Sequence, residues 1–324
     1  MTILLDFEKN IAGLEQELAR LEDLGRTDPD GLGASITELR DHVTSLRQAQ
    51  FAALTAYQRT MLCRHPERPF TLDYLERAFT DFMELHGDRA FMDDPSVVGG
   101  LARIGGRPVM VIGHQKGRTA EDIMARNFGM SKPEGFRKGL RLMRMAERLG
   151  RPLVTFIDTP GAYPGLGAEE RGQAEAIACN IMELAGLRVP IVSVVIGEGG
   201  SGGALALAVA NRILMLDNAM FSVISPEACA SILWREKVQA PRAAEALRYM
   251  AQDCRRIGVA DEVLPEPSTG AHRDHATAAA TLGEAIARHL DELTAMTPDE
   301  LRADRARKLR QLGVFEQRPA TGTR

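Results

Sequence analysis

The chain has 324 residues, of which 44% are hydrophobic and 26% charged, with a formal net charge of −4. This composition is that of a soluble globular protein, long enough for one large domain with appendages or for two domains. The small negative charge excludes a global basic field directed at nucleic acid or membrane. The apolar runs are too short to span a bilayer, and the N-terminus lacks a signal-peptide pattern. We therefore expect a cytoplasmic protein with no membrane contact.

The cysteines and histidines argue against a metal site in this chain. The four cysteines are scattered without CxxC spacing, which is typical of reduced thiols that fill a core; they are Cys63, Cys179, Cys229 and Cys254. His272 and His275 form a possible pair of ligands, but they lie in a Gly- and Pro-flanked loop with no third ligand nearby. We predict no bound metal.

Residues 1–70 are predicted to form an N-terminal helical extension. Two stripes of apolar residues recur at helical spacing, namely Ile11, Leu14, Leu18 and Leu21, then Leu39, Val43 and Leu46. Residues 28–33 contain proline and glycine and break the pattern. Short helices must pack on something. Bracing of the core and contact with another subunit both remain open.

Residues 71–265 contain repeated strand–loop–helix units. The first includes a hairpin, because the apolar segments 97–104 and 108–113 flank the pair Gly105–Gly106. His114 ends the second of these strands, and we expect it to be a hydrogen-bonded structural residue, with general-base catalysis as the alternative. Residues 116–151 hold ten Lys and Arg against four acids. Within them Arg137, Arg141, Arg144 and Arg148 line one helix face, either as a solvated surface or as an anion-binding face beside Lys116 and Arg118.

A second unit begins with the apolar strand 153–158 and continues into a loop rich in proline and glycine. Its Asp158-Thr-Pro-Gly161 resembles the DxxG switch of GTPases. The chain contains no GxxxxGK[ST] loop to hold phosphates, so that interpretation is disfavoured.

The third unit carries the strongest chemical signal. The apolar strand 191–196 leads into five glycines within residues 197–203, and a small-residue helix follows. Bare backbone N–H groups at a helix N-terminus suit developing negative charge, so we expect an oxyanion site made of main chain. Three alternatives remain: close packing, a dinucleotide-binding fingerprint (Gly197, Gly199, Gly202, with Asp217), and a nucleophile elbow around Ser201. The elbow would need a partner from Asp217, Asp261, His272 and His289.

The remainder, 266–324, is predicted to be a linker, charged helices over about 276–312 and a disordered tail over 317–324.

Seven motifs occur in an order that is more specific than any one of them: His114–Arg118, Arg126–Met130, Pro133–Arg137, Phe156–Gly165, Gly167–Gly172, Gly197–Gly203 and Ser222–Trp234. In this order they resemble the carboxyltransferase α subunit of bacterial acetyl-CoA carboxylase, from about Leu5 to about Leu312. Ala228 departs from the glycine expected there and makes that turn slightly less permissive.

The resemblance implies an α/β fold of the crotonase type, a spiral of repeated ββα units, with N-terminal and C-terminal helical extensions. It implies transfer of a carboxyl group from N-carboxybiotin, carried on the biotin carboxyl carrier protein, to acetyl-CoA. Malonyl-CoA would form, the first committed step of fatty acid biosynthesis. The implied partners are a zinc-ribbon β subunit in an α2β2 assembly and the ATP-using biotin carboxylase. Biotin would not be attached covalently to this chain.

By the same resemblance, this subunit supplies the anion site for the biotin ureido oxygen. We expect the N–H groups of Gly202 and Gly203 to be the donors, because they lie where the turn enters the helix. The predicted substrate-binding residues are Gly200, Ser201, Gly161, Ala162, Tyr163, Lys116 and Arg118. The alternatives are a serine hydrolase that uses Ser201 and a non-catalytic partner subunit of a related acyl-CoA carboxylase.

Overall fold

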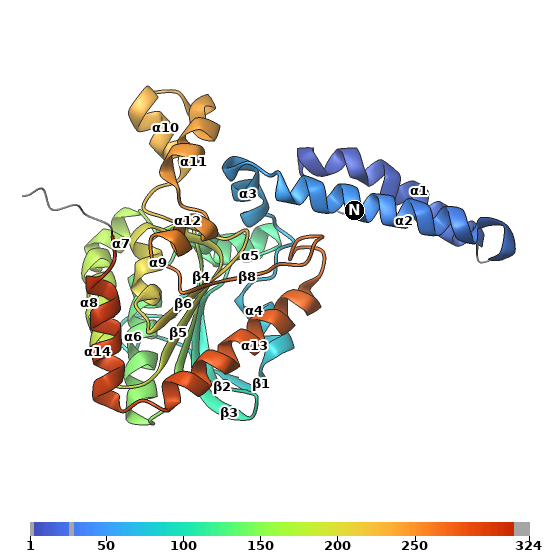
Figure 1. Cartoon of the computed structure of the whole chain (residues 1–324). Coiled ribbons are helices and arrows are strands. Elements are labelled where there is room, and N and C mark those ends of the chain that lie inside the picture. The colour runs from blue at the N-terminus through green and yellow to red at the C-terminus, as the bar shows by residue number, and fades with distance from the viewer. Residues whose placement is uncertain (1–2, 26–28, 314–324) are drawn as a thin grey trace, which may run out of the picture.

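The computed structural model describes residues 3–25 and 29–313. They form a body built around one sheet, from which a helical arm projects (Figure 1). The tail predicted to be disordered, 317–324, lies outside the described residues. The division of the chain at about residues 70 and 265 stays a prediction.

The N-terminal extension is helical, as predicted. Within residues 1–70 it comprises η1 (Asp6–Glu8), α1 (Lys9–Gly25), α2 (Pro29–Ala52) and α3 (Ala56–Cys63), and α4 (Thr71–Ala78) follows it. Helices α1 and α2 form an antiparallel arm that projects away from the sheet (Figure 1). Ile11 and Val43 are buried between them, whereas Leu46 is 37% exposed. The ion pair Arg40–Glu22, at 2.6 Å, ties the two helices together. What the arm contacts outside this chain stays open.

The central sheet has eight strands: β1 (Thr80–Glu84), β2 (Val97–Ile104), β3 (Arg107–His114), β4 (Leu153–Thr159), β5 (Ile191–Gly200), β6 (Arg212–Leu216), β7 (Met220–Ser222) and β8 (Glu262–Leu264). Their order is β1-β2-β3-β4-β5-β6-β8, and β7 pairs with β5. The first three strands are antiparallel, and the pairs from β3 to β8 are parallel. The predicted hairpin is confirmed: Gly105 and Gly106 take φ values of 54° and 77°, as a tight turn between twisted strands requires.

Helices cover both faces of the sheet. After β3 they are α5 (Ala120–Ala125), η2 (Asn127–Gly129), α6 (Pro133–Arg148), α7 (Leu166–Glu170), α8 (Gln173–Gly186), α9 (Ser201–Ala208), α10 (Pro226–Trp234), η3 (Lys237–Gln239), α11 (Ala240–Leu247), α12 (Ala251–Arg256), α13 (His275–Thr294) and α14 (Pro298–Arg310). Helices α6, α8 and α14 lie on one side and α4 and α13 on the other, while α10 and α11 stand off the body (Figure 1). The predicted C-terminal helices join the main core, α13 through Leu282, Ile286 and Leu290 and α14 through Leu301.

Strand β5 is longer than the sequence pattern predicted. We expected a turn from Gly197 to Gly203, but the strand continues through Gly200. The reason is β7, which pairs with Gly199 and Gly200. A Cβ atom at Gly199 would lie 2.4 Å from the Phe221 ring, so glycine here permits strand contact rather than a turn.

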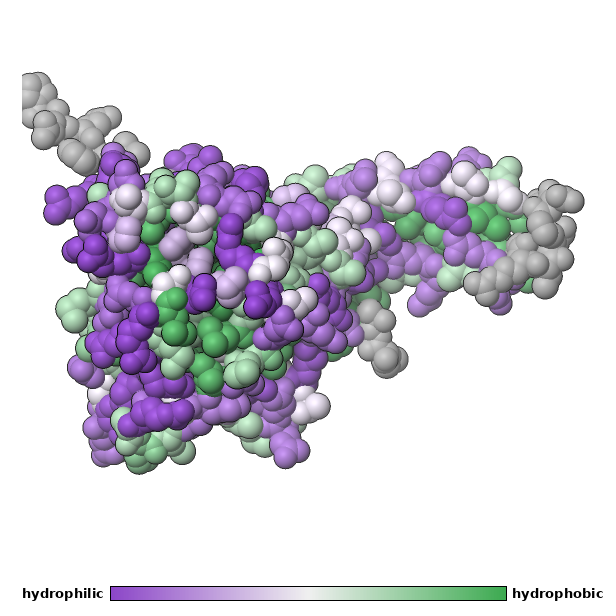
Figure 2. All heavy atoms as spheres, turned by 90° about the horizontal axis from the view of Figure 1, so that it is seen from below, coloured by the Kyte–Doolittle hydropathy of each residue, from purple (hydrophilic) through white to green (hydrophobic). Residues whose placement is uncertain are grey.

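The surface is mostly polar, and hydrophobic residues gather along the seam between the arm helices and on part of the body (Figure 2). None of the helices in the described ranges is long and apolar enough to cross a membrane.

Candidate active site

Two predicted loops meet at the carboxyl ends of β4 and β5. A Cβ atom on Gly203 would lie 2.7 Å from the carbonyl carbon of Gly161, and one on Gly200 would lie 2.2 Å from the carbonyl oxygen of Pro160. Such distances are shorter than any side chain tolerates, so the glycines allow the two backbones to touch. The structure thus brings together the glycine turn and the loop that begins at Gly161.

The start of α9 supplies the backbone donors. The helix begins at Ser201, with Gly200 as its N-cap residue. Gly202 and Gly203 are therefore in the first turn, where N–H groups have no carbonyl partner four residues earlier within the helix. Ser201 is exposed, Gly202 half-buried and Gly203 buried. The arrangement suits an anion that approaches from the solvent side of the turn.

Ser201 has the backbone of a nucleophile elbow without its partners. Its φ is 52°, a left-handed conformation that is uncommon for serine. The possible partners are engaged elsewhere: Asp217 with Arg59, Asp261 with Lys308, His272 with Glu8 and His289 with Glu262. None of the hydrogen bonds found among residues 3–25 and 29–313 joins one of them to Ser201. The dinucleotide interpretation is also disfavoured, because Gly197 and Gly199 lie within β5.

Lys116 lies beside this turn in a buried ion network, which we define as Arg64, Lys116, Asp158 and Glu198. The Lys116 Nζ atom is 2.7 Å from Asp158 Oδ1 and 2.7 Å from Glu198 Oε2. Arg64 Nε donates to Glu198 Oε1 at 2.7 Å. Burial alone would raise the pKa of Glu198, but the charges of Lys116 and Arg64 lower it to about 2.

Of the four residues in this network, only Lys116 was predicted to be a site residue. Lys116 was predicted to bind substrate, and the structure shows its ammonium group paired with two carboxylates. Burial alone would lower the pKa of Lys116, but the negative charges of Asp158 and Glu198 raise it by more than burial lowers it. The ammonium group therefore stays charged. Asp158 and Glu198 were missed as site residues. Both are acids at the ends of apolar strands, Asp158 just before its proline- and glycine-rich loop and Glu198 between Gly197 and Gly199, and this was the available signal.

Arg118 points to the N-terminal helices instead. Its guanidinium pairs with Asp73 at 2.7 Å and lies 4.6 Å from the centre of the Phe70 ring. Phe70 and Lys116 both line a cavity of about 280 Å³ that also includes Glu198 and Phe128. Substrate binding by Lys116 and Arg118 stays a prediction.

The loop after β4 is held by backbone contacts. Ala162 forms an isolated β-bridge with Ser131, and the Tyr163 N–H donates to the Ser131 carbonyl oxygen at 3.0 Å. Gln173 Nε2 donates to the carbonyl oxygens of both Ser131 and Tyr163 at 2.9 Å. These bonds hold the loop after β4 in place against the start of α9.

His114 is buried beneath the turn. The pKa of His114 falls to about 3, mainly because the ring is buried and also because the charge of Lys116 is near. Hydrogen bonding to the carbonyl groups of Phe156 and Gly203 acts in the opposite direction and is too weak to offset this. A buried ring with so low a pKa is a weak proton acceptor and is shielded from solvent, which does not suit a general base. Neither ring nitrogen meets hydrogen-bond geometry with a partner in the described part of the chain. The buried position agrees with the expected structural role, and the backbone groups of Phe156 and Gly203 are the hydrogen-bonding groups that act on its pKa.

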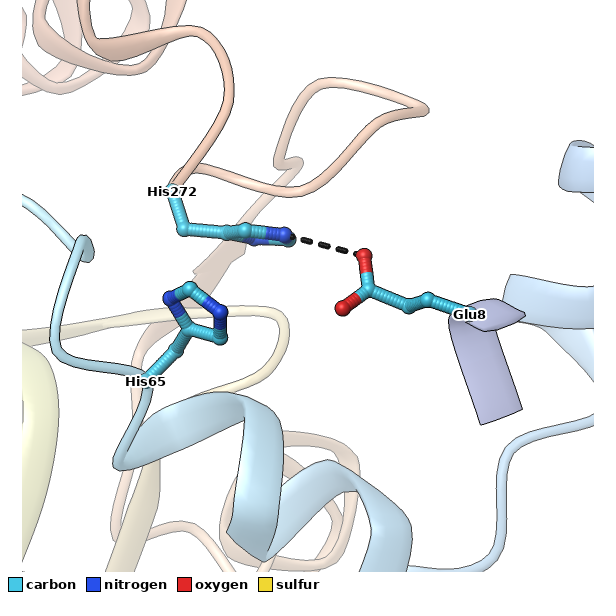
Figure 3. Close-up of side chains that lie close together, drawn as sticks. All are labelled: Glu8, His65 and His272. Atoms are coloured by element: carbon cyan, nitrogen blue, oxygen red, sulfur yellow. Dashed lines mark hydrogen bonds and ion pairs between the residues drawn. The ribbon is translucent and has the colours of Figure 1, made fainter. Parts of the chain in front are cut away.

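Glu8, His65 and His272 form the one cluster of metal-type ligands found within the described ranges (Figure 3). His272 Nε2 lies 3.1 Å from Glu8 Oε1, which Arg273 also contacts at 3.0 Å. The His65 Nδ1 atom accepts the Glu67 N–H, so we assign the proton to Nε2, which faces the Ile3 carbonyl. His65 then has no free lone pair for a metal. The cluster ties η1 to the segment after β8.

The arginine face of α6 lines a separate hollow of about 410 Å³, together with Asp88, Arg89 and Leu140. Arg137 pairs with the buried Asp88 at 2.8 Å, and Arg144 pairs with Glu183 at 3.0 Å. Neither Lys116 nor Arg118 lines this hollow. Contrary to the expectation, the arginine face therefore does not lie beside these two residues. An anion-binding role for the face stays a prediction.

Comparison with solved structures supports the fold. The 12S transcarboxylase, in a structure that holds methylmalonyl-coenzyme A and methylmalonic acid, superposes with a TM-score of 0.58 at 17% identity. The match covers 79% of this chain and 44% of that one. This likeness, together with the mixed sheet, confirms the predicted crotonase-like fold class.

Sequence comparison identifies the family. The model described as acetyl co-enzyme A carboxylase carboxyltransferase-like matches residues 4–313. The acetyl-coenzyme A carboxylase carboxyl transferase subunit alpha of Halorhodospira halophila is 55% identical, over 95% of this chain and 97% of its own length. Its counterpart in Geobacter metallireducens is 53% identical, over 97% and 98%. The chain belongs to the acetyl-coenzyme A carboxylase carboxyltransferase family, as its ordered motifs predicted.

Proposed function

We propose that this chain is the α-type subunit that carries the biotin half of a carboxyltransferase site. Its reaction transfers the carboxyl group of N-carboxybiotin to the methyl carbon of acetyl-CoA and yields malonyl-CoA. The observation that carries the proposal is the first turn of α9, where Gly202 and Gly203 present backbone N–H groups beside a second glycine loop. Family membership supplies the class of reaction.

The chemistry needs two anion sites. The N–C bond of carboxybiotin breaks as CO2 leaves, and the electron pair becomes negative charge on the ureido oxygen. The ureidate then removes a methyl proton from acetyl-CoA, and the enolate attacks the CO2. No acid–base side chain is required, which agrees with the paired, buried state of the carboxylates near the turn. Preorganised N–H donors stabilise such charge, each by about 3 kcal/mol.

Gly202 and Gly203 are assigned to the ureido oxygen. In this assignment Gly200 and Ser201 shape the approach to the donors, and the loop of Gly161, Ala162 and Tyr163, which contacts Gly203, lies on the other side. The N-terminus of α9 adds partial positive charge on the side where these N–H groups meet the ureido oxygen.

The second anion site, for the thioester enolate, is assigned to a zinc-ribbon β subunit in an α2β2 assembly. Biotin arrives on its carrier protein after ATP-dependent loading by biotin carboxylase, and is not attached to this chain. The cytoplasm is the proposed compartment. The reaction needs two anion sites, and this chain offers one glycine-rich segment of the kind that forms such a site. This supports the assignment of the second site to the β subunit.

The test is reconstitution with a β subunit from a member of the same family. The reverse reaction, carboxyl transfer from malonyl-CoA to biocytin, gives a direct assay. The mixture should form acetyl-CoA and carboxybiocytin. A serine hydrolase would instead hydrolyse the thioester without biocytin and would be labelled at Ser201 by a fluorophosphonate; that result would overturn the proposal.

A further inference from the structure

Lys116 joins the strands that lead into the two glycine loops. It follows β3, and its Nζ contacts Asp158 on β4 and Glu198 on β5, both at 2.7 Å. Its side chain is only 15% exposed. The methylene chain passes Gly129, where a Cβ atom would come within 2.7 Å of Lys116 Cγ. The lysine is thus held along its whole length.

Asp158 also binds the backbone of β5 directly. Its Oδ1 atom accepts the N–H of Glu198 at 2.9 Å, and a Cβ atom at Gly197 would lie 2.4 Å from the same oxygen. The Asp158 carboxylate therefore adds a side-chain contact to the backbone pairing with β4 and β7 that positions the end of β5, and Lys116 holds that carboxylate in place.

The alignment of β4 and β5 also sets the positions of the two loops that follow these strands. Asp158 precedes Pro160 by two residues, and Glu198 precedes Gly200 by two. Pro160 and Gly200 are in contact, because a Cβ at Gly200 would lie 2.2 Å from the Pro160 carbonyl oxygen. A change in the spacing of Asp158 and Glu198 would shift the start of α9 against the loop that it touches.

Charge gives a second reason for a cation here. Two carboxylates that converge on one point repel each other, and buried charges that lose their partner are costly. Glu198 lies only four residues before Gly202. An uncompensated carboxylate at this position would oppose an anion forming at the turn. Lys116 contacts both carboxylates, and Arg64 supplies the second positive charge through its contact with Glu198 at 2.7 Å.

We propose that Lys116 is a positioning residue for the oxyanion turn, acting through Asp158 and Glu198 rather than by touching substrate. This rests on the proposed function of Gly202 and Gly203.

The primary experiment is Lys116→Met in the reconstituted α/β complex. Methionine keeps much of the stem but removes the cation. In carboxyl transfer from malonyl-CoA to biocytin, we expect kcat to fall by about 10- to 100-fold, the range that follows from misplacing a catalytic group by up to 1 Å. The KM for malonyl-CoA should change less than about threefold, because the thioester side is assigned to the β subunit.

A second substitution separates charge balance from simple loss of packing. Asp158→Asn removes one of the two carboxylates while its Oδ1 can still accept the Glu198 N–H. Added to Lys116→Met, it leaves Glu198 with Arg64 alone. The double variant should therefore recover a large part of the kcat that the single variant loses. Recovery of the thermal midpoint without recovery of kcat would show that Lys116 acts on the reaction by a route other than Asp158 and Glu198, and would overturn the proposal.

Arg107→Met is the matched control. It removes an ion pair with Asp291, at 2.6 Å, from the opposite end of β3. Its kcat should equal that of the unmodified complex. Wild-type kcat in Lys116→Met would also refute the positioning role, whereas no transfer by the unmodified complex would refute the proposed function itself.

If Lys116→Met fails to fold, Glu198→Gln replaces it. Here Lys116 keeps Asp158, and Arg64 keeps Glu227 at 2.8 Å, so no charge loses every partner. The link from Lys116 to the turn strand is weakened, and kcat should still fall by about tenfold. Full kcat in this folded variant would contradict the inference.

Discussion

Gly203 lies against Gly161 so closely that a Cβ atom on Gly203 would come within 2.7 Å of the Gly161 carbonyl carbon. At Gly202, one residue earlier, a Cβ atom would meet only the Ile177 side chain, at 3.7 Å. The two proposed donors therefore differ in what glycine does for them. Gly203 permits contact between two loops, whereas Gly202 has room for a small side chain.

The first prediction uses this difference. Gly203→Ala should force the two loops apart and reduce kcat by about 100-fold, the scale of losing one oxyanion donor. Gly202→Ala keeps its N–H and its space, so we expect turnover within about threefold of the unmodified complex. Both are measured as carboxyl transfer from malonyl-CoA to biocytin. Near-normal turnover in a folded Gly203→Ala complex would show that contact between the loops is dispensable.

Ser201 should be dispensable as a nucleophile. Ser201→Ala removes the hydroxyl and leaves the backbone donors, so transfer should stay within about tenfold, as a lost hydrogen bond costs about 1 kcal/mol. Intact-mass measurement during turnover should detect no acyl-enzyme. A trapped acyl group on Ser201, lost together with all activity in the alanine variant, would restore the hydrolase interpretation.

The isolated chain should lack carboxyl transfer activity. It contributes one oxyanion turn, and the enolate site is assigned to the partner subunit. The same assay, run with the purified chain and then with added β subunit, should show activity only in the second case. Robust transfer by the chain alone would mean that both anion sites lie within it.

Stability should depend on the buried pair Arg68–Glu266, whose atoms approach to 2.6 Å. Burial alone would raise the pKa of Glu266, but the charge and hydrogen bonds of Arg68 lower it to about 2. Because the folded pKa is below the unfolded value, the pair stabilises the fold fully above pH 4.5 and progressively less as the pH falls toward 2.

Glu266→Gln tests that dependence. At neutral pH it leaves the Arg68 charge buried with a neutral partner, so we expect a loss of about 3 kcal/mol in the free energy of unfolding. The difference between the two proteins should shrink between pH 4.5 and pH 2. A difference that stays constant over this range, measured by denaturant unfolding, would show that Glu266 does not titrate with folding.

Much of the fold followed from local sequence. The hairpin at Gly105–Gly106, the paired N-terminal helices and the strand–loop–helix units were all predicted, because apolar periodicity and turn residues act over a few positions. The family followed from seven ordered motifs. A helix after the glycine-rich segment was also predicted, but the structure begins it earlier, at Ser201, so that Gly202 and Gly203 lie within it.

The errors concern contacts between distant residues. Gly197–Gly200 was predicted to be part of a turn, since a glycine that accommodates Phe221 of a later strand looks the same in sequence as a glycine that makes a turn. The pairing of Lys116 was missed for the same reason. Its partners lie 42 and 82 residues further along the chain, in strands that only the folded sheet brings together.

The central claim is that backbone N–H groups of Gly202 and Gly203 stabilise the biotin anion, and replacing an amide by an ester tests it most directly. Glycolic acid, incorporated at position 202 or 203 by nonsense suppression, removes the N–H and adds no side chain. In the reconstituted complex each ester should lower kcat for transfer from malonyl-CoA to biocytin by about 100-fold, with little change in the KM for malonyl-CoA. Wild-type kcat with an ester at each position in turn would contradict the account.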